Sequence, residues 1–384
     1  MRFDTLYGKT SSGKLQIWEV FTEGNAITTR HGQLGGKIQE KTTYATAKNV
    51  GKANETSPER QAELEAEAKL TKQLDRGYFR TKEEALNFKD TSPMKAQNFN
   101  DFEHKIKYNC YVQPKLNGMR FKLTKRDGLF VGESKAGLDS PVPPHWVYGL
   151  KLLDAYGFLD NGLDGEIYAG LVSEGGLSLQ EIISAYRKYN ENTHKLEYHV
   201  YDIPIEGETF DQRAVRLGNL YYKILILEKE GTKLPIKVVW TGLVERPEEA
   251  NRIYQYLVDQ GYEGMMYRNA GGVYEFGSRS YDLLKRKAFV DFEAEVLSVE
   301  KDNNGCGVLT CKTINGKHIG SQFKVLMRID ADEVNYRDYN NALALVGKTV
   351  TVEADEYSDS GTPTKPRGTR VRNVNSITKE SIDD

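Results

Sequence analysis

The stretch Lys115-Leu116-Asn117-Gly118-Met119-Arg120 lies between two strand-like runs, 108–113 and 119–123. An Asn-Gly pair between two such runs is the strongest short-range signal for a β-hairpin, because both residues tolerate positive φ. One interpretation is therefore a turn flanked by two solvated charges. The other is that Lys115 is a nucleophile, since a lysine amine kept neutral by burial or by a nearby cation attacks readily, with Arg120 directed at the same phosphate. The rest of the chain has to decide between them.

Length and composition narrow the class of protein. A chain of 384 residues exceeds one ordinary domain, and 39% hydrophobic with 28% charged residues is typical of a globular protein. The formal net charge of −2 means that any basic, nucleic-acid-binding surface is local. Cys110, Cys306 and Cys311 form no CxxC pair, which argues against a zinc ribbon or a disulfide framework. No apolar run is long enough to span a bilayer, so we expect a cytoplasmic protein with no membrane partner.

The first 90 residues show short strands, a glycine-rich loop at 31–37 and a helix over 57–76, capped by Thr56 with Glu59. The loop is typical of a tight turn, although its glycines would also let backbone N–H groups approach phosphate. Trp18, this loop and Gly77-Tyr78 after the helix resemble a WGR domain, although His31 and Gln33 replace the name-giving Trp and Arg. The resemblance implies a domain that grips DNA near a break. A structural or protein-contact domain is the alternative.

Five short motifs follow in order: Lys-x-x-Gly-x-Arg at 115–120, Asp-Gly-Glu at 164–166, Tyr-Asp-Ile at 201–203, Glu-Gly-Met-Met at 263–266 and Lys-x-Lys at 285–287. Singly, each has an ordinary interpretation, because a lone Glu166 or Glu263 is usually a surface carboxylate and a lone Tyr201 is core packing. Jointly, they resemble the covalent nucleotidyltransferase superfamily, and in detail the small, phage-like ATP-dependent DNA ligases. Pro93-Met94-Lys95-Ala96 and Ser134-Lys135-x-Gly137 add further matches.

The resemblance implies an α+β, multidomain fold. We expect a small β-rich WGR-like domain with a helix at 1–90, joined by a linker at 90–93. An adenylyltransferase domain built on antiparallel sheet follows at 91–290, and an OB-fold β-barrel at 291–384. The barrel is also indicated by alternating strand-like runs, and its tail at 363–372 resembles the last ligase motif.

The implied activity is sealing of nicks in duplex DNA by a monomer, with ATP and Mg²⁺. Lys115 is the implied catalytic residue, and Glu263 and Asp164 the implied metal ligands. The implied ATP-binding set comprises Gln113, Lys115, Arg120, Glu166, Tyr201, Lys285, Lys287 and Arg372. Within it, Gln113 reads the adenine edge, Tyr201 stacks on adenine, and the two strand lysines share a face toward the α-phosphate. The implied DNA-binding set comprises Arg120, Lys135, Asn117 and Arg370.

Two departures from the ligase pattern leave alternatives open. Asn117 stands where ligases usually have Asp, which would slow joining unless another acid such as Asp164 serves. Asn373-Val374 follow Arg372 where an acid is usual. An RNA ligase, a GTP-using capping enzyme and a non-catalytic protein that binds DNA breaks are the alternatives. Arg120 argues against one common RNA-ligase pattern, and the ligase-like tail argues against capping.

Overall fold

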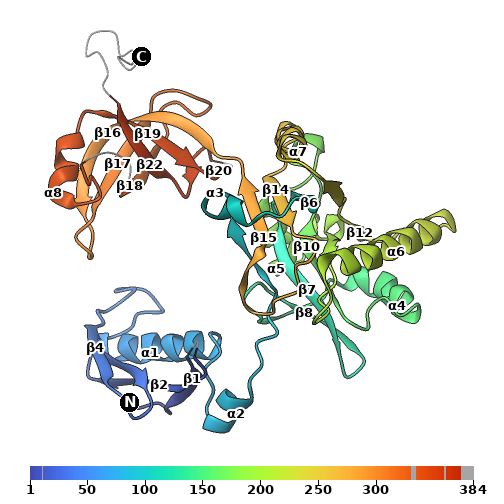
Figure 1. Cartoon of the computed structure of the whole chain (residues 1–384). Coiled ribbons are helices and arrows are strands. Elements are labelled where there is room, and N and C mark those ends of the chain that lie inside the picture. Colours follow the sequence, from blue (N-terminus) through green and yellow to red (C-terminus); the bar gives the residue numbers. More distant parts are fainter. Residues whose placement is uncertain (11, 330–333, 359, 373–384) are drawn as a thin grey trace. The chain divides into compact units, whose positions relative to one another are not determined.

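The computed structural model describes residues 1–10, 12–329, 334–358 and 360–372 (Figure 1). The chain forms two compact units, Met1–Glu249 with Tyr267–Leu284, and Ala250–Met266 with Lys285–Asp384. Helices and antiparallel sheets occur together, so the predicted mixed, multidomain class is confirmed, while the boundaries at 90 and 290 stay predictions. Among the described residues, no helix has the length and apolar character needed to cross a lipid bilayer.

The chain begins with an antiparallel four-stranded sheet, β1 (Leu6–Lys9), β2 (Leu15–Glu23), β3 (Ala26–Gln33) and β4 (Ile38–Tyr44), followed by helices α1 (Pro58–Leu74) and α2 (Lys82–Asn87). Leu6, Val20, Ile27 and the alanines of α1 form one core, on which Trp18 packs. The first three residues of the expected glycine-rich loop belong to β3, and residues 34–37 join β3 to its partner β4, as the tight-turn interpretation predicts. Ser57, rather than the expected Thr56, caps α1, because its side chain accepts from the Arg60 N–H.

The rest of the first unit is built on two sheets. One has the strand order β12 (Ile236–Val238), β11 (Glu197–Asp202), β10 (Leu163–Tyr168), β7 (Met119–Arg126), β8 (Leu129–Glu133) and β9 (Asp139–Ser140). The other has the order β13 (Gly242–Val244), β6 (Cys110–Lys115), β14 (Gly264–Arg268), β15 (Arg279–Lys287) and β5 (Lys95–Asn98). Strands β14 and β15 each carry chain from one compact unit into the other.

The hairpin interpretation of Asn117-Gly118 is wrong. Strands β6 and β7 on either side of this pair belong to different sheets and are not partners. Among the described residues with positive φ, neither Asn117 nor Gly118 occurs. The same reasoning does succeed at Asp127-Gly128, where φ is +49° and +77° and Arg126 pairs with Leu129. The stretch around Lys115 therefore carries the chain from one sheet to the next.

Helices and short turns connect these strands. They are α3 (Phe99–Phe102), α4 (Val147–Ala155), α5 (Leu179–Arg187), α6 (Phe210–Lys229) and α7 (Pro247–Asp259), with 3₁₀ turns at Glu103–Lys105, Pro144–Trp146, Val172–Glu174 and Thr193–Lys195. Thr209 caps α6 in a capping box with Gln212, which explains why this helix begins at Phe210. Trp146, which directly precedes α4, is buried. Its ring stacks on Tyr198 with 5.3 Å between ring centroids and meets Phe121 edge-on with 5.5 Å between centroids, which anchors α4 beside β7 and β11.

The expected linker at 90–93 is packed into the first unit. Ser92 and Met94 are 5% and 3% exposed. The Ser92 carbonyl accepts from the Gly277 N–H at 2.8 Å, and the Met94 N–H donates to the Tyr274 hydroxyl at 3.2 Å. The Thr91 carbonyl accepts from the buried Lys122 ammonium. This segment is therefore fixed at both its amide and its carbonyl groups.

The second unit contains a closed five-stranded barrel. Its strands follow the order β16 (Val290–Lys301), β17 (Gly307–Thr313), β18 (Gln322–Met327), β22 (Arg367–Arg372) and β19 (Thr349–Ala354). The short helix α8 (Tyr339–Ala342), a 3₁₀ turn (Leu343–Leu345) and the strand pair β20 (Glu356–Tyr357) and β21 (Pro363–Thr364) complete it. Alternate residues such as Phe292, Ala294 and Val296 point inward and form the barrel core.

Candidate active site

Gly118 brings the Lys115 segment against strand β10. A Cβ at Gly118 would lie 2.4 Å from the Ile167 carbonyl oxygen and 2.7 Å from Glu166 Cγ. No other residue type fits at that distance, so this glycine serves close approach rather than a turn. Across the sheet, Arg120 on β7 is the direct partner of Glu166 on β10. The first two predicted motifs therefore meet in the structure.

Arg120 is held by a buried carboxylate. Its Nε donates to Asp164 Oδ1 at 2.7 Å, its Nη2 donates to Asp164 Oδ2, and Nη2 also donates to the Met94 carbonyl at 3.0 Å. Asp164 is 0% exposed and accepts a third bond from the Tyr274 hydroxyl at 2.6 Å. Burial alone lowers the pKa of Arg120, but the Asp164 carboxylate outweighs it and raises that pKa well above its ordinary value.

A cluster of charges surrounds Lys135. The pKa of Lys135 is lowered, first by burial and then by the positive charges of Arg279, Arg120 and Lys115. The carboxylate of Glu166 acts in the opposite direction. We call Lys115, Arg120, Lys135, Arg279 and Glu166 the Lys115 cluster. Four cations with one carboxylate form a site suited to an anion with several negative oxygens, such as a phosphate.

Tyr201 lies beside the cluster on β11. Its hydroxyl donates to Glu166 Oε2 at 3.3 Å, and the Arg120 and Arg268 guanidinium carbons lie 5.0 and 5.6 Å from its ring centroid. The next residue, Asp202, is 0% exposed and accepts from Arg213 Nε at 2.7 Å and from Arg268 Nη1. The aspartate of the Tyr-Asp-Ile motif therefore fixes the strand that carries Tyr201.

Two of the predicted roles do not fit the geometry. Gln113 is 1% exposed, and its amide group donates to the Tyr201 carbonyl and to Thr241 Oγ1 and accepts from Arg268 Nε at 2.7 Å. Its hydrogen-bonding groups are taken by the protein, so it cannot read an adenine edge in this conformation. Asp164 is 0% exposed and its carboxylate already accepts from Arg120 and Tyr274, an arrangement that favours a structural role over that of a metal ligand or replacement acid.

The remaining predicted residues belong to the second unit. Lys285 and Lys287 lie two residues apart on β15 and so share a face. Lys287 Nζ lies 2.6 Å from Glu263 Oε1 and 2.9 Å from Asp355 Oδ2. Arg372 Nε donates to Glu293 Oε1 at 3.2 Å and to Thr351 Oγ1 at 2.8 Å. Arg370 is exposed on β22, and Asn373-Val374 lie outside the described residues.

Gly264 has a structural role in the Glu-Gly motif. Its φ is +148°, and a Cβ there would lie 2.1 Å from the Arg286 carbonyl oxygen. The Ala288 N–H donates to the Glu263 carbonyl at 3.0 Å, so the two strands touch at this point. The glycine thereby brings the chain that carries Glu263 against the chain that carries Lys287.

Sequence reasoning did not single out several residues that contact the predicted site residues, namely Arg268, Tyr274 and Arg279 in the first unit and Asp355 in the second. Arg268 ends the Glu-Gly-Met-Met-Tyr-Arg run, so its position beside a motif was a usable signal. Tyr274 and Asp355 offered none, because their partners lie 110 and 68 residues away along the chain. As for metals, no three His, Cys, Asp or Glu side chains of the described chain gather into a site for an ion.

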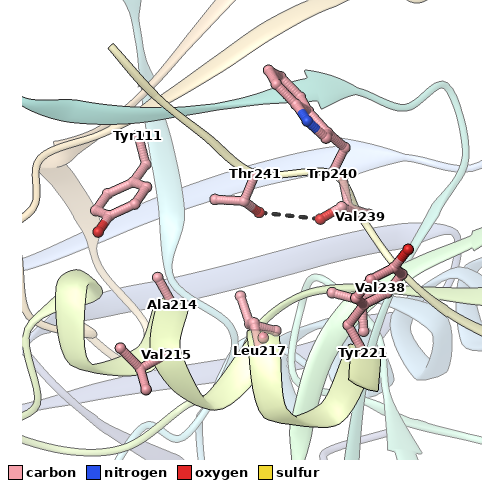
Figure 2. A pocket seen from close by; sticks show the side chains of 10 residues that line it. Tyr111, Ala214, Val215, Leu217, Tyr221, Val238, Val239, Trp240 and Thr241 are labelled. Atoms are coloured by element: carbon pink, nitrogen blue, oxygen red, sulfur yellow. Dashed lines mark hydrogen bonds between the residues drawn. The ribbon is translucent and has the colours of Figure 1, made fainter. Parts of the chain in front are cut away.

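An apolar pocket lies outside the Lys115 cluster, with a volume of about 490 Å³. Ala214, Val215, Leu217 and Tyr221 on α6 form one wall, and Tyr111 and the segment 238–241 form the other (Figure 2). The hydroxyl of Thr241 donates to the Val239 carbonyl at 3.1 Å and accepts from Gln113, two residues before Lys115. The pocket thus contacts the strand of the nucleophile candidate.

Comparison with known proteins agrees with this geometry. The family model described as "ATP dependent DNA ligase domain" matches residues 93–287, just over half of the chain, and spans all five motifs. The chain belongs to the ATP-dependent DNA ligase family. The predicted resemblance to small, phage-like ligases is thereby confirmed, whereas no comparison tests the WGR-like part.

Two relatives of this ligase-family chain are viral. It is 25% identical over 171 residues to the DNA ligase of Enterobacteria phage T4, a match that covers 42% of this chain and 32% of the relative. The chain thus matches about a third of the length of the phage ligase. It is 27% identical over 364 residues to the DNA ligase of African swine fever virus (Warthog isolate), which covers 88% of this chain and 80% of the relative.

A solved structure extends the likeness to the fold. A structure from a study of Lig E DNA ligases aligns with a TM-score of 0.55 at 21% identity, and covers 74% of this chain and all of the other. At that identity the match supports a shared ligase fold.

Proposed function

We propose that this protein seals nicks in duplex DNA as a monomer, with ATP as the source of an activating AMP group. Family membership supports the reaction class. The observation that carries the proposal is the Lys115 cluster: Arg120 pairs directly with Glu166 across the sheet, Gly118 brings the Lys115 segment against Glu166, and the charges of Arg279, Arg120, Lys115 and Glu166 all act on Lys135. A DNA-binding protein without catalysis has no need of a lysine nucleophile candidate within such a cluster.

The reaction has three in-line displacements at phosphorus. Lys115 Nζ attacks the α-phosphorus of ATP, a phosphoramide bond to AMP forms, and pyrophosphate leaves. The 5′-phosphate of the nick then attacks the same phosphorus, so AMP passes to DNA and the lysine amine is released. Finally, the 3′-hydroxyl attacks the 5′-phosphorus and AMP leaves. Positioning and charge neutralisation supply most of the catalysis in reactions of this class.

The proposed roles follow from the side chains present. Glu166 accepts hydrogen bonds from the ribose hydroxyls, and Tyr201 offers its ring to adenine. Lys285 and Lys287 neutralise the α-phosphate. Arg372 orients pyrophosphate once its guanidinium has broken its hydrogen bonds to Glu293 and Thr351. Asn117, Arg120, Lys135 and Arg370 are the proposed DNA contacts.

The guanidinium of Arg120 is held in a fixed orientation and has one donor group available for a phosphate. Asp164 and Met94 take its Nε and Nη2 groups, and within the described chain its Nη1 group donates to no protein acceptor. Its side chain is 17% exposed, so one donor edge of a fixed guanidinium can meet the ligand.

Mg²⁺ is the proposed metal, with Glu263 as its protein ligand. Mg²⁺ keeps several waters and commonly uses one or two carboxylates together with substrate phosphates, so a single glutamate with a 15% exposed side chain fits that donor set. When bound, the ion supplies charge neutralisation at the phosphates.

The flanking parts are proposed to hold DNA. A closed five-stranded barrel with helix α8 between β18 and β19 along the chain supports an OB-fold, which commonly binds nucleic acid. The sheet of β1–β4 with α1 is compatible with a WGR-like domain beside the break.

Covalent labelling tests the proposal. Wild-type protein and Lys115→Ala are mixed with Mg²⁺ and either ATP or GTP labelled at the α-phosphate. We expect label from ATP on wild type alone, followed by transfer to a nicked duplex. Label from GTP instead would indicate capping chemistry, and transfer to nicked RNA but not DNA would indicate an RNA ligase. With intact mass excluding prior adenylylation, no label from either nucleotide would leave a break-binding protein.

A further inference from the structure

Asp355 directly follows β19 of the barrel, and three cationic side chains lie around its carboxylate. Its Oδ2 accepts from Lys287 Nζ at 2.9 Å and from Lys365 Nζ at 2.8 Å, and Arg367 Nη2 lies 3.5 Å from Oδ1. The Asp355 side chain is 9% exposed, whereas those of Lys365 and Arg367 are 71% and 47% exposed. All four residues belong to the second unit.

Lys287 is thereby held between two carboxylates, because Glu263 Oε1 lies 2.6 Å from the same ammonium. An ammonium has three donors, and at least two of them point at carboxylates here. Burial alone lowers the pKa of Lys287, but Glu263 and Asp355 outweigh it and raise that pKa. The charge of this lysine is therefore compensated before any phosphate arrives.

We propose that Asp355 is a positioning residue that occupies Lys287 in place of the nucleotide phosphate and competes with that phosphate for it. The inference rests on the proposed function, in which Lys287 binds ATP. A phosphate that takes the Lys287 donors is repelled by the Asp355 carboxylate until the two anions separate. Asp355 can give up Lys287 without becoming an unpaired anion, because Lys365 and Arg367 remain with it.

Two substitutions with opposite expected effects test the competition. In Asp355→Asn the competing charge is lost, so the apparent KM for ATP in lysyl-AMP formation falls by about three- to tenfold. In Lys365→Gln, Asp355 loses an exposed partner and holds Lys287 more tightly, so the same KM rises by about twofold. The rate at saturating ATP stays within about twofold of wild type in both, since neither side chain is assigned to the reacting atoms.

Glu353→Gln is the matched control. Glu353 lies two residues before Asp355 on β19, and its nearest described ion pair is with Arg328 at 3.9 Å. We expect it to leave the KM for ATP unchanged. A general loss of barrel stability would move the thermal midpoint and the rate in all three variants, and it cannot lower KM in one and raise it in another.

The inference is overturned if Asp355→Asn leaves KM unchanged or raises it, or if Lys365→Gln lowers it. Failure of the proposed function has a different signature, which is absence of label on wild type. In that case, calorimetric binding of inorganic tripolyphosphate still tests the competition. Tighter binding by Asp355→Asn than by wild type supports it, and equal or weaker binding refutes it.

Discussion

Asp164 lies at the centre of a buried set of hydrogen bonds that positions Arg120. The carboxylate is 0% exposed, and Arg120 and Tyr274 bind it from two sides. Its neighbour in the same motif, Glu166, belongs to the Lys115 cluster instead. Two acids two residues apart on one strand therefore have different partners, since Asp164 binds Arg120 and Glu166 acts on the charge of Lys135.

Asp164→Asn should destabilise the first unit. Removing one partner of a buried ion pair leaves an uncompensated charge, here on Arg120, and costs about 3–5 kcal/mol. Urea unfolding measures the loss, and lysyl-AMP formation should fall with it as Arg120 loses its position. A variant of normal stability whose defect is cured by extra Mg²⁺ would show that Asp164 binds metal after all.

Gly118→Ala should damage the site through backbone contact. The new Cβ meets the Ile167 carbonyl oxygen at 2.4 Å, so the segment must shift by several tenths of an ångström, which we expect to cost about 1–3 kcal/mol and to slow lysyl-AMP formation at least tenfold.

Gly218→Ala is the control for that change. This glycine lies in α6, and a Cβ there has nothing within 4 Å, so alanine should raise stability by about 0.5–1 kcal/mol. Equal effects of the two alanines on labelling would remove the close-approach explanation.

At the scale of elements, strands β7 and β8 share a buried ion pair. Lys122 and Glu133 are each 2% exposed and 2.7 Å apart, and Lys122 also donates to the Thr91 carbonyl. Glu133 lies two residues before Lys135 of the cluster, and Lys122 contacts the packed segment at 90–94 through Thr91. The pair therefore connects three elements around the site.

Lys122→Met alone should lower stability by about 3–5 kcal/mol, because Glu133 is left buried with Arg126 as its remaining described partner. The double variant Lys122→Met, Glu133→Leu should recover most of that loss, since two apolar side chains of similar volume need no partner. A double-mutant cycle from chemical unfolding measures the coupling. Additive losses would mean that the pair contributes little.

The sequence predicted elements well where the signal is local. The helix expected over 57–76 is observed at Pro58–Leu74, and the Asp127-Gly128 pair forms the two-residue turn that this residue type favours. The hairpin interpretation of Asn117-Gly118 is wrong because a local pattern cannot show which strands are hydrogen-bonded to each other. Here the two residues connect strands of different sheets. The adenine-reading role of Gln113 does not fit the geometry for a related reason. Its hydrogen-bond partner Arg268 is 155 residues away along the chain, so the local sequence could not reveal it.

At the scale of the whole molecule, the predicted site residues are divided between two compact units. Lys115, Arg120, Lys135, Glu166 and Tyr201 belong to the first, and Glu263, Lys285, Lys287, Arg370 and Arg372 belong to the second. The order of the motifs along the chain predicted the family correctly, because each motif is short and its chemistry is specific. It could not predict that Lys287 and Arg372 already have carboxylate partners.

The N-terminal sheet makes a further prediction possible. Lys37 and Lys41 are exposed, the first in the glycine-rich loop and the second on β4. If both contact phosphates, the double variant to Gln should weaken binding to nicked duplex and flatten the slope of log K against log salt by about 1.8. Fluorescence anisotropy between low and moderate salt measures that slope. An unchanged slope would assign the domain a role other than DNA contact.

The packed segment at 90–94 also decides where this chain can be divided. Its bonds to Lys122, Gly277, Tyr274 and Arg120 mean that a fragment begun at residue 95 would lack the groups that hold Arg120 in place. Trypsin has an exposed target just upstream at Lys89, whose side chain is 68% exposed. Cleavage there leaves a fragment that starts at Asp90 and keeps every one of those bonds, so limited digestion should release a catalytic piece that still accepts AMP.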